Sequence, residues 1–113
     1  MTTSQTSVFL TEMSEEKPIP AGKLAYFRTR LRYALHEIVL NEFLGQKATG
    51  KTNKAHLAKR IGRKPEQVSR WLGAPGNWTI DTLSDLCLAM NSELSFTLIC
   101  HTKTHEEAER WIK

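Results

Sequence analysis

The chain has 113 residues, the size of one compact domain, because single domains commonly contain about 100 to 150 residues. Its two cysteines, Cys87 and Cys100, are too few for a disulfide scaffold, and no signal-like segment stands at the N-terminus, so we expect a cytoplasmic protein. No apolar run approaches the roughly 20 residues that cross a bilayer, so we expect no membrane partner.

Basic residues are concentrated in one segment. Between Gln46 and Leu72 eight basic residues stand against one acidic residue, Glu66, a net charge of +7. Because the whole chain carries +4, the remaining residues carry −3. A positive field confined to one segment attracts polyanions, so we predict nucleic acid as the main partner.

The first half of the chain predicts an arm followed by a long helix. Residues 1–20 are rich in Thr, Ser and Glu and lack helical periodicity, which predicts a flexible N-terminal arm. From Lys23 to Leu44 apolar residues recur at the helical period, and Gly45 is expected to end this helix. The apolar stripe consists of Leu24, Phe27, Leu31, Leu35, Ile38 and Leu40.

Three shorter helices are predicted next. Asn53 to Ile61 forms one, stopped by Gly62, and Pro65 to Leu72 forms another, since proline suits the first helical turn. After a turn-rich loop, Thr79 caps a helix that runs to Met90. The apolar residues at helical spacing, which predict its inward face, are Ile80, Leu83, Leu86, Cys87 and Met90. Residues 21–92 are therefore predicted to form the folded domain.

Residues 93–113 are predicted to form an extension that mediates dimerisation. Leu94 to Cys100 is rich in strand formers and predicts a β-strand, which would pair with Val8 to Leu10 or with a second copy. A capping box at Thr104 begins a short terminal helix that carries Trp111. The predicted fold is thus mainly all-α, a bundle of four to five helices plus a C-terminal strand and helix.

The segment Gly45 to Thr52 matches the spacing of a P-loop, in which Lys51 would reach a terminal phosphate and Thr52 would bind magnesium. A P-loop also needs a buried strand just before its first glycine, and the preceding residues have a helical period. A P-loop nucleotide-binding protein is therefore the minor alternative.

Residues Lys54 to Gly73 match a helix-turn-helix unit. Leu57 and Ala58 stand where a small residue lets two helices cross closely, Gly62 stands in the turn, and Val68 and Trp71 face inward. This segment resembles the helix-turn-helix of the lambda-repressor-like (Xre) family of bacterial and phage DNA-binding proteins, and the resemblance extends over residues 23–92. The sequence departs from the family at Lys64, where a capping Ser or Thr is usual.

The resemblance implies how the chain contacts double-stranded DNA. The helix that starts at Pro65 would enter the major groove, and its outward side chains would read base edges. These base-reading candidates are Glu66, Gln67, Ser69 and Arg70. Residues at the start of the preceding helix and on the flanking loops would contact phosphates. The phosphate candidates are Thr52, Asn53, Lys54, Arg63, Lys64, Gly76 and Asn77.

We therefore predict a sequence-specific transcriptional regulator and no enzymatic activity, cofactor or metal site, since no CxxC pair or catalytic constellation occurs. One recognition helix reads only a few base pairs, so we expect a homodimeric repressor on a palindromic operator with half-sites about 34 Å apart. The alternative is an antitoxin, a protein that represses its own operon and also binds a toxin protein.

Overall fold

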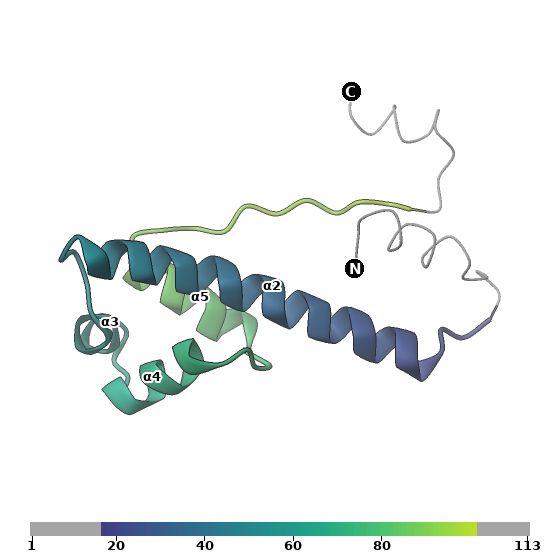
Figure 1. Ribbon diagram of the computed structural model, residues 1–113, viewed down its shortest axis with the longest axis horizontal. Coiled ribbons are helices and arrows are strands. Elements are labelled where there is room, and N and C mark those ends of the chain that lie inside the picture. Colours follow the sequence, from purple (N-terminus) through teal and green to yellow (C-terminus); the bar gives the residue numbers. More distant parts are fainter. Residues whose placement is uncertain (1–16, 102–113) are drawn as a thin grey trace, which may run out of the picture. The chain divides into compact units, whose positions relative to one another are not determined.

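The computed structural model describes residues 17–101. Within them it contains four α-helices: α2 (Ala21–Ala48), α3 (Lys54–Ile61), α4 (Pro65–Gly73) and α5 (Ile80–Ala89) (Figure 1). This confirms a mainly helical fold. Of the described residues, 25–95 form one compact unit, and 17–24 and 96–101 belong to another. None of the four helices is long and apolar enough to cross a membrane.

Helix α2 continues beyond Gly45, so the predicted end of this helix is wrong. The helix ends at Ala48, and Gly50 follows with a φ of 75°. The Gly50 N–H donates to the Lys47 carbonyl (3.1 Å), and the Lys51 N–H donates to the Gln46 carbonyl (2.9 Å). Glycine adopts the left-handed conformation of Gly50 at little cost, so the helix can end there. Gly45 does not end it, because a glycine inside a helix costs only about 1 kcal/mol relative to alanine. The helix therefore passes through the first glycine and ends at the second.

Only the second half of α2 contributes to the core, and it does so with a face that the predicted stripe missed. The buried residues of α2 are His36, Val39 and Phe43, whereas Leu31 and Ile38 are more than half exposed. Two apolar stripes run along this helix, and both have the helical period. The choice between them depends on where the other helices pack, which a local pattern does not contain.

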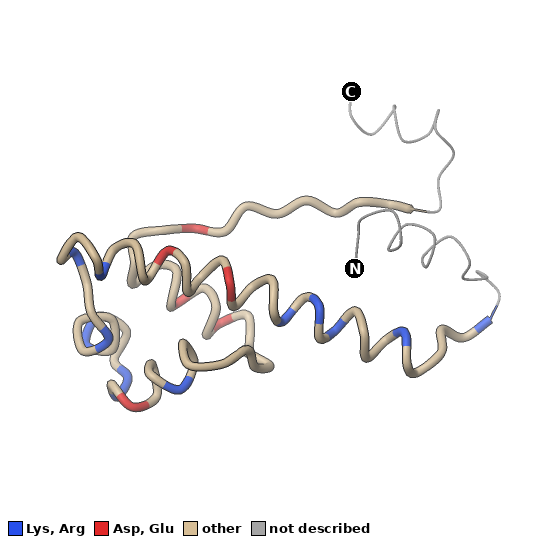
Figure 2. The backbone as a smooth tube through the Cα atoms, viewed as in Figure 1, with Lys and Arg blue, Asp and Glu red and all other residues tan. Residues whose placement is uncertain are grey.

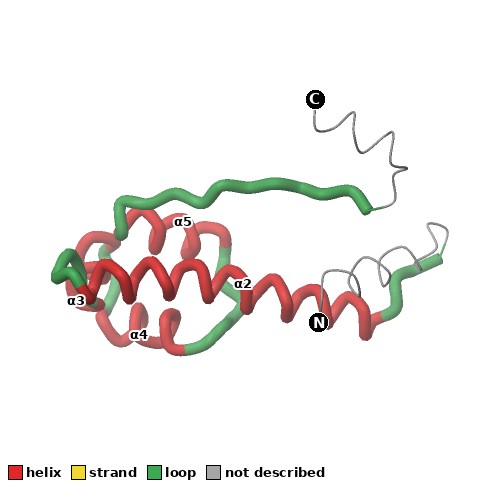
Figure 3. The backbone as a smooth tube through the Cα atoms, turned by 45° about the horizontal axis from the view of Figure 1, so that its top comes forward, coloured by secondary structure: helices red, strands yellow, loops and turns green. Residues whose placement is uncertain are grey.

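The core lies where the second half of α2 meets the three short helices (Figures 1 and 3). Helix α3 contacts both α4 and α5, and Val39 and Phe43 of α2 belong to the same core. The buried core residues are Val39, Phe43, Leu57, Ala58, Val68, Leu72, Leu86, Cys87, Ala89 and Met90.

The short helices begin and end close to the predicted positions, because local signals mark their ends. Asn53 caps α3, Gly62 ends it with a φ of 66°, and Thr79 caps α5. Proline occupies the start of α4, and the helix extends one residue further than predicted, to Gly73. Ile80, however, is 84% exposed, so its predicted inward position is wrong.

The strand predicted for residues 94–100 is not found. These residues run as an extended stretch without a strand partner among residues 17–101, and Phe96 and Leu98 are 82% and 100% exposed (Figure 3). A strand requires a ladder of backbone hydrogen bonds to a neighbouring strand, and no strand is found among residues 17–101. Its predicted partner, Val8 to Leu10, and the predicted terminal helix with Trp111 lie outside the described residues.

Candidate nucleic-acid interface

Helices α3 and α4 are joined by a short turn centred on Gly62. The Gly62 N–H donates to the carbonyl of Lys59, and the Arg63 N–H donates to the carbonyl of Ala58 at 2.9 Å. Leu57, Ala58 and Val68 are buried, and Trp71 is partly buried against the same core. The turn and the buried residues together hold α4 in place, so its opposite face is presented to solvent.

The outward face of α4 carries an acidic and a basic side chain. Glu66 and Arg70 are both exposed and lie four residues apart, on the same side of the helix. Neither side chain forms a hydrogen bond or an ion pair with another described residue. The Arg70 guanidinium is therefore free to make two parallel hydrogen bonds to one planar ligand. Gln67, half-buried, flanks this line of residues.

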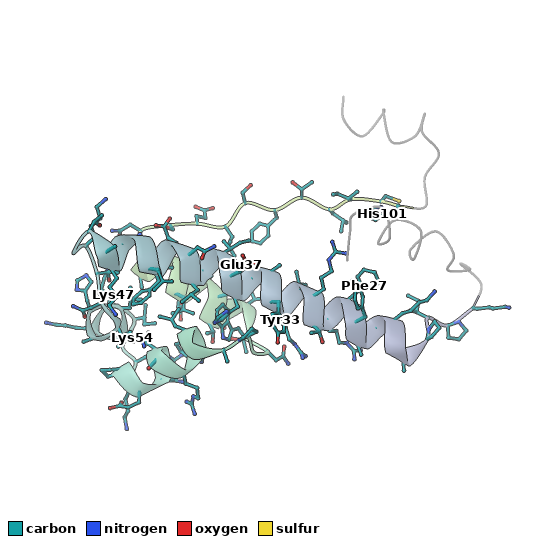
Figure 4. All side chains as sticks on the ribbon, in the orientation of Figure 1. Phe27, Tyr33, Glu37, Lys47, Lys54 and His101 are labelled. Atoms are coloured by element: carbon teal, nitrogen blue, oxygen red, sulfur yellow. The ribbon has the colours of Figure 1, made fainter. Side chains whose placement is uncertain are left out.

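Ser69, on the other flank, is joined to α3. The ammonium of Lys54, which Figure 4 labels on α3, donates to the Ser69 hydroxyl oxygen at 3.2 Å, so Lys54 bridges the two helices. Because the serine oxygen accepts this bond, the hydroxyl hydrogen remains able to donate to a ligand. The structure thus brings a phosphate candidate and a base-reading candidate together.

The start of α3 presents Asn53 and conceals Thr52. The Asn53 side-chain oxygen accepts from the His56 N–H at 2.8 Å, which leaves the side-chain NH₂ free to donate. Thr52 is only 7% exposed, and its hydroxyl has no hydrogen-bond partner among the described residues. A phosphate at this helix start would therefore meet Asn53 and backbone amides, with the Thr52 side chain beneath the surface.

The remaining phosphate candidates flank α4 on both sides. Arg63 and Lys64 are exposed immediately before the helix, and Lys64 forms no side-chain cap bond at the helix start. Gly76 and Asn77 lie in the loop after the helix; Asn77 is exposed, and Gly76 is half-buried beside Trp78. All four lie close in sequence to the ends of α4, where they can flank a ligand bound to its outward face.

His36 has a positioning role that the sequence reasoning missed. It is 8% exposed, its Nε2 donates to the carbonyl of Leu72 at 3.0 Å, and its ring lies against Trp78 with centroids 5.7 Å apart. The bond ties the last turn of α4 to α2. The spacing of His36, Val39 and Phe43 is the sequence signal for its burial.

Charge is distributed unevenly over the described residues (Figure 2). Helices α3 and α4 and the turn between them carry Glu66 as their only acidic residue, whereas α5 carries Asp81 and Asp85 and no basic residue. The basic side chains of the first region are Lys54, Lys59, Arg60, Arg63, Lys64 and Arg70. Helices α3 and α4 are therefore positive and α5 is negative, and the first half of α2 adds three arginines, Arg28, Arg30 and Arg32.

The segment that matches the P-loop spacing has a different structure. Gly45 to Ala48 belong to α2, and the residues before Gly45 are helical rather than a strand. A phosphate-binding loop needs backbone amides that converge on one point, and amides within a helix point along its axis. This segment therefore lacks the arrangement that nucleotide binding requires.

The part of the chain that the structure describes contains no cluster of potential metal ligands. Within residues 17–101 no group of three or more His, Cys, Asp or Glu side chains is placed to hold a metal ion. Burial raises the pKa of the Cys87 thiol, which favours its neutral form in the core.

No protein-family model matches the chain, and comparison with curated proteins and with solved structures found no match.

Proposed function

We propose that this chain is a sequence-specific DNA-binding regulator of the lambda-repressor-like kind, with α4 as its recognition helix. One observation carries the proposal: α3 and α4 are joined through Gly62 and packed on a small core so that the polar face of α4 points outward from the most basic part of the chain. A short helix supported in this way is a unit that fits the DNA major groove.

The polar side chains on α4 suit different base edges. Arg70 can bind guanine through two hydrogen bonds, and Gln67 can do the same with adenine. Glu66 can accept from the amino group of cytosine, and Ser69 can donate its free hydroxyl hydrogen. These four side chains would determine which sequence is preferred.

The residues around α4 would bind the DNA backbone. Asn53 and Lys54 lie at the start of α3, where backbone amides and the helix dipole also favour a phosphate. Arg63 and Lys64 precede α4, and the loop with Gly76 and Asn77 follows it. Such contacts fix the orientation of the helix on the duplex without selecting a sequence.

We also propose that the protein binds DNA as a homodimer and acts as a repressor. Two copies of α4 would read half-sites about 34 Å apart on a palindromic operator. The candidate interface is the segment 94–100 or the segment that includes Trp111. Phe96 and Leu98 are 82% and 100% exposed, and pairing with a second copy would remove these apolar side chains from water.

A titration of duplex DNA tests this function. The full chain is titrated against a fluorescently labelled random-sequence duplex at several salt concentrations, and magnesium ATP is titrated in parallel. We expect duplex binding that weakens steeply as salt rises, because cations are released from the DNA, and no nucleotide binding. Absence of duplex binding at low salt, or ATP binding that depends on Lys51, would show the proposal to be wrong.

A further inference from the structure

A groove lies between the first half of α2 and the loop that follows α4. One wall contains Arg28 and Arg32 of α2, and the other consists of residues 76–79 and the start of α5. The groove has a volume of about 420 Å³, and the loop lies beside α2 in both backbone views (Figures 1 and 3). None of the residues that line it is Asp or Glu. The groove therefore has a positive lining that no acidic side chain within it neutralises.

Both arginines are available to a ligand. Arg28 and Arg32 lie four residues apart, which places them on one face of the helix, about 6 Å apart along its axis. Neither side chain forms a hydrogen bond or an ion pair with another described residue. Arginine is well suited to anionic oxygens, because its planar guanidinium presents several N–H donors.

The part of α2 that carries these arginines is less buried than the rest of the helix. None of residues 25–35 is fully buried, whereas the second half of the same helix supplies His36, Val39 and Phe43 to the core. A ligand in the groove would therefore reach this part of the helix from solvent.

The groove is held in a fixed relation to the recognition helix. The loop that forms its second wall begins where α4 ends, and the bond from His36 to the Leu72 carbonyl joins the end of α4 to α2. Gly76 and Asn77, which line the groove, are also the phosphate candidates that follow α4. A DNA strand that leaves these two residues would therefore enter the groove.

We propose that Arg28 and Arg32 bind backbone phosphates of the DNA next to the bases that α4 reads, so that α2 extends the interface beyond the helix-turn-helix. This inference rests on the proposed function. Leu31 and Ile80, both exposed at the groove, would lie against deoxyribose rings. The contacts would add affinity and lengthen the site without changing which bases are preferred.

The test compares a double variant, Arg28→Ala and Arg32→Ala, with the unchanged full chain in salt-dependent duplex titrations. Removing one arginine–phosphate interaction should lower the slope of log K against log salt by about 0.9, so the double variant should show a slope smaller by about 1.8. The ratio of affinities for a preferred duplex, selected with the unchanged protein, and a random duplex should stay the same. Alanine suits an exposed helix position, and circular dichroism checks that the variant remains folded.

Arg30→Ala is the matched control. Arg30 is exposed on the same helix and carries the same charge, but two residues along a helix turn it to the opposite side from the groove. We expect its slope to stay close to that of the unchanged protein. A decrease in slope as large as half that of the double variant would mean that only the overall charge matters, and it would overturn the proposed groove contact.

Two further measurements decide between possible ligands. Ethylation of individual phosphates should block the unchanged protein at positions beside the α4 site, and the double variant should lose this sensitivity only there. An unchanged salt slope in the double variant would contradict the proposal. Binding of polyglutamate through these arginines, with DNA binding unaffected in the double variant, would contradict it too and would assign the groove to an acidic protein. Failure of the unchanged protein to bind any duplex would instead refute the proposed function itself, and the groove contact with it.

Discussion

Helices α4 and α5 are similar in length and pack on the same core, but they begin differently. The Thr79 hydroxyl oxygen accepts from the Thr82 N–H at 3.0 Å at the start of α5, whereas Lys64 at the start of α4 makes no side-chain bond. The outward face of α4 carries Glu66 and Arg70, whereas the only charged residues of α5 are acidic. The two helices therefore differ in their caps and in their surface charge, and the proposed function assigns DNA contact to α4 alone.

The shared core gives the largest expected effect. Leu57 is fully buried in α3, which contacts both helices, so Leu57→Ala should lower the free energy of unfolding by about 2–5 kcal/mol. Leu88→Ala, at an exposed position of α5, should change it by no more than about 0.5 kcal/mol. Urea unfolding followed by circular dichroism measures both. Similar decreases in the two variants would show that the two helices do not depend on a common core.

The second largest effect concerns DNA binding, which should depend on the outward charge of α4 much more than on that of α5. Arg70→Ala should cost about 1–3 kcal/mol in binding to a preferred duplex and less on random DNA, because the variant cannot hydrogen-bond to the base. Asp85→Asn on α5 should leave sequence discrimination unchanged and bind DNA slightly more tightly, because a negative charge is removed. Anisotropy titrations with both duplexes provide the comparison. A uniform decrease in affinity for Arg70→Ala would assign that residue to a phosphate.

The two helix starts should respond in opposite directions. Lys64→Ser supplies the missing cap and should raise the free energy of unfolding by about 0.5–1 kcal/mol, while Thr79→Ala should lower it by about 1 kcal/mol. Lys64→Ser should also reduce the salt slope of DNA binding by about 0.9 if Lys64 contacts a phosphate. Thermal or urea unfolding measures the change in stability, and the duplex titration measures the change in salt slope. A stabilised variant with an unchanged salt slope would remove Lys64 from the interface.

The last prediction concerns the reactivity of the thiol in α5, which involves no substitution. Burial raises the pKa of Cys87, so less thiolate is present near pH 8, and the side chain is shielded, whereas Cys100 is exposed. A thiol reagent at pH 8 should modify Cys87 at least about 100-fold more slowly than Cys100, because reaction requires local opening. Because the folded pKa is raised, any stability that Cys87 contributes is present below the unfolded pKa and decreases as pH rises above it. One fast phase for both thiols would contradict this burial.

The short helices are well predicted from the sequence because their limits depend on local chemistry. Asn53, Gly62, Pro65 and Thr79 act through bonds and dihedral preferences within a few residues, and the structure has them in those roles. Leu57, Ala58 and Val68 are buried as the helix-turn-helix pattern predicts. The polar face of α4 follows directly once its buried side is known.

The errors concern features that depend on distant parts of the chain. The buried face of α2 is selected by the helices that pack against it, so the predicted stripe wrongly includes Leu31 and Ile38 and leaves out His36. Ile80 resembles a core residue in pattern, yet nothing covers it among the described residues. Thr52 stands in a polar loop that predicts exposure, but the structure buries its hydroxyl. In each case tertiary packing overrides a local pattern.

The hydrogen bond between His36 and α4 also fixes a feature of the His36 ring that can be measured by spectroscopy. A carbonyl oxygen only accepts hydrogen bonds, so the Leu72 carbonyl requires a hydrogen on Nε2, and the neutral ring must be the Nε2–H tautomer. That tautomer has a distinct nitrogen spectrum in nuclear magnetic resonance, and its hydrogen is shielded from exchange with water by burial. A single imidazole, remote from the outward face of α4, thus provides a spectroscopic signal of whether the end of that helix is docked.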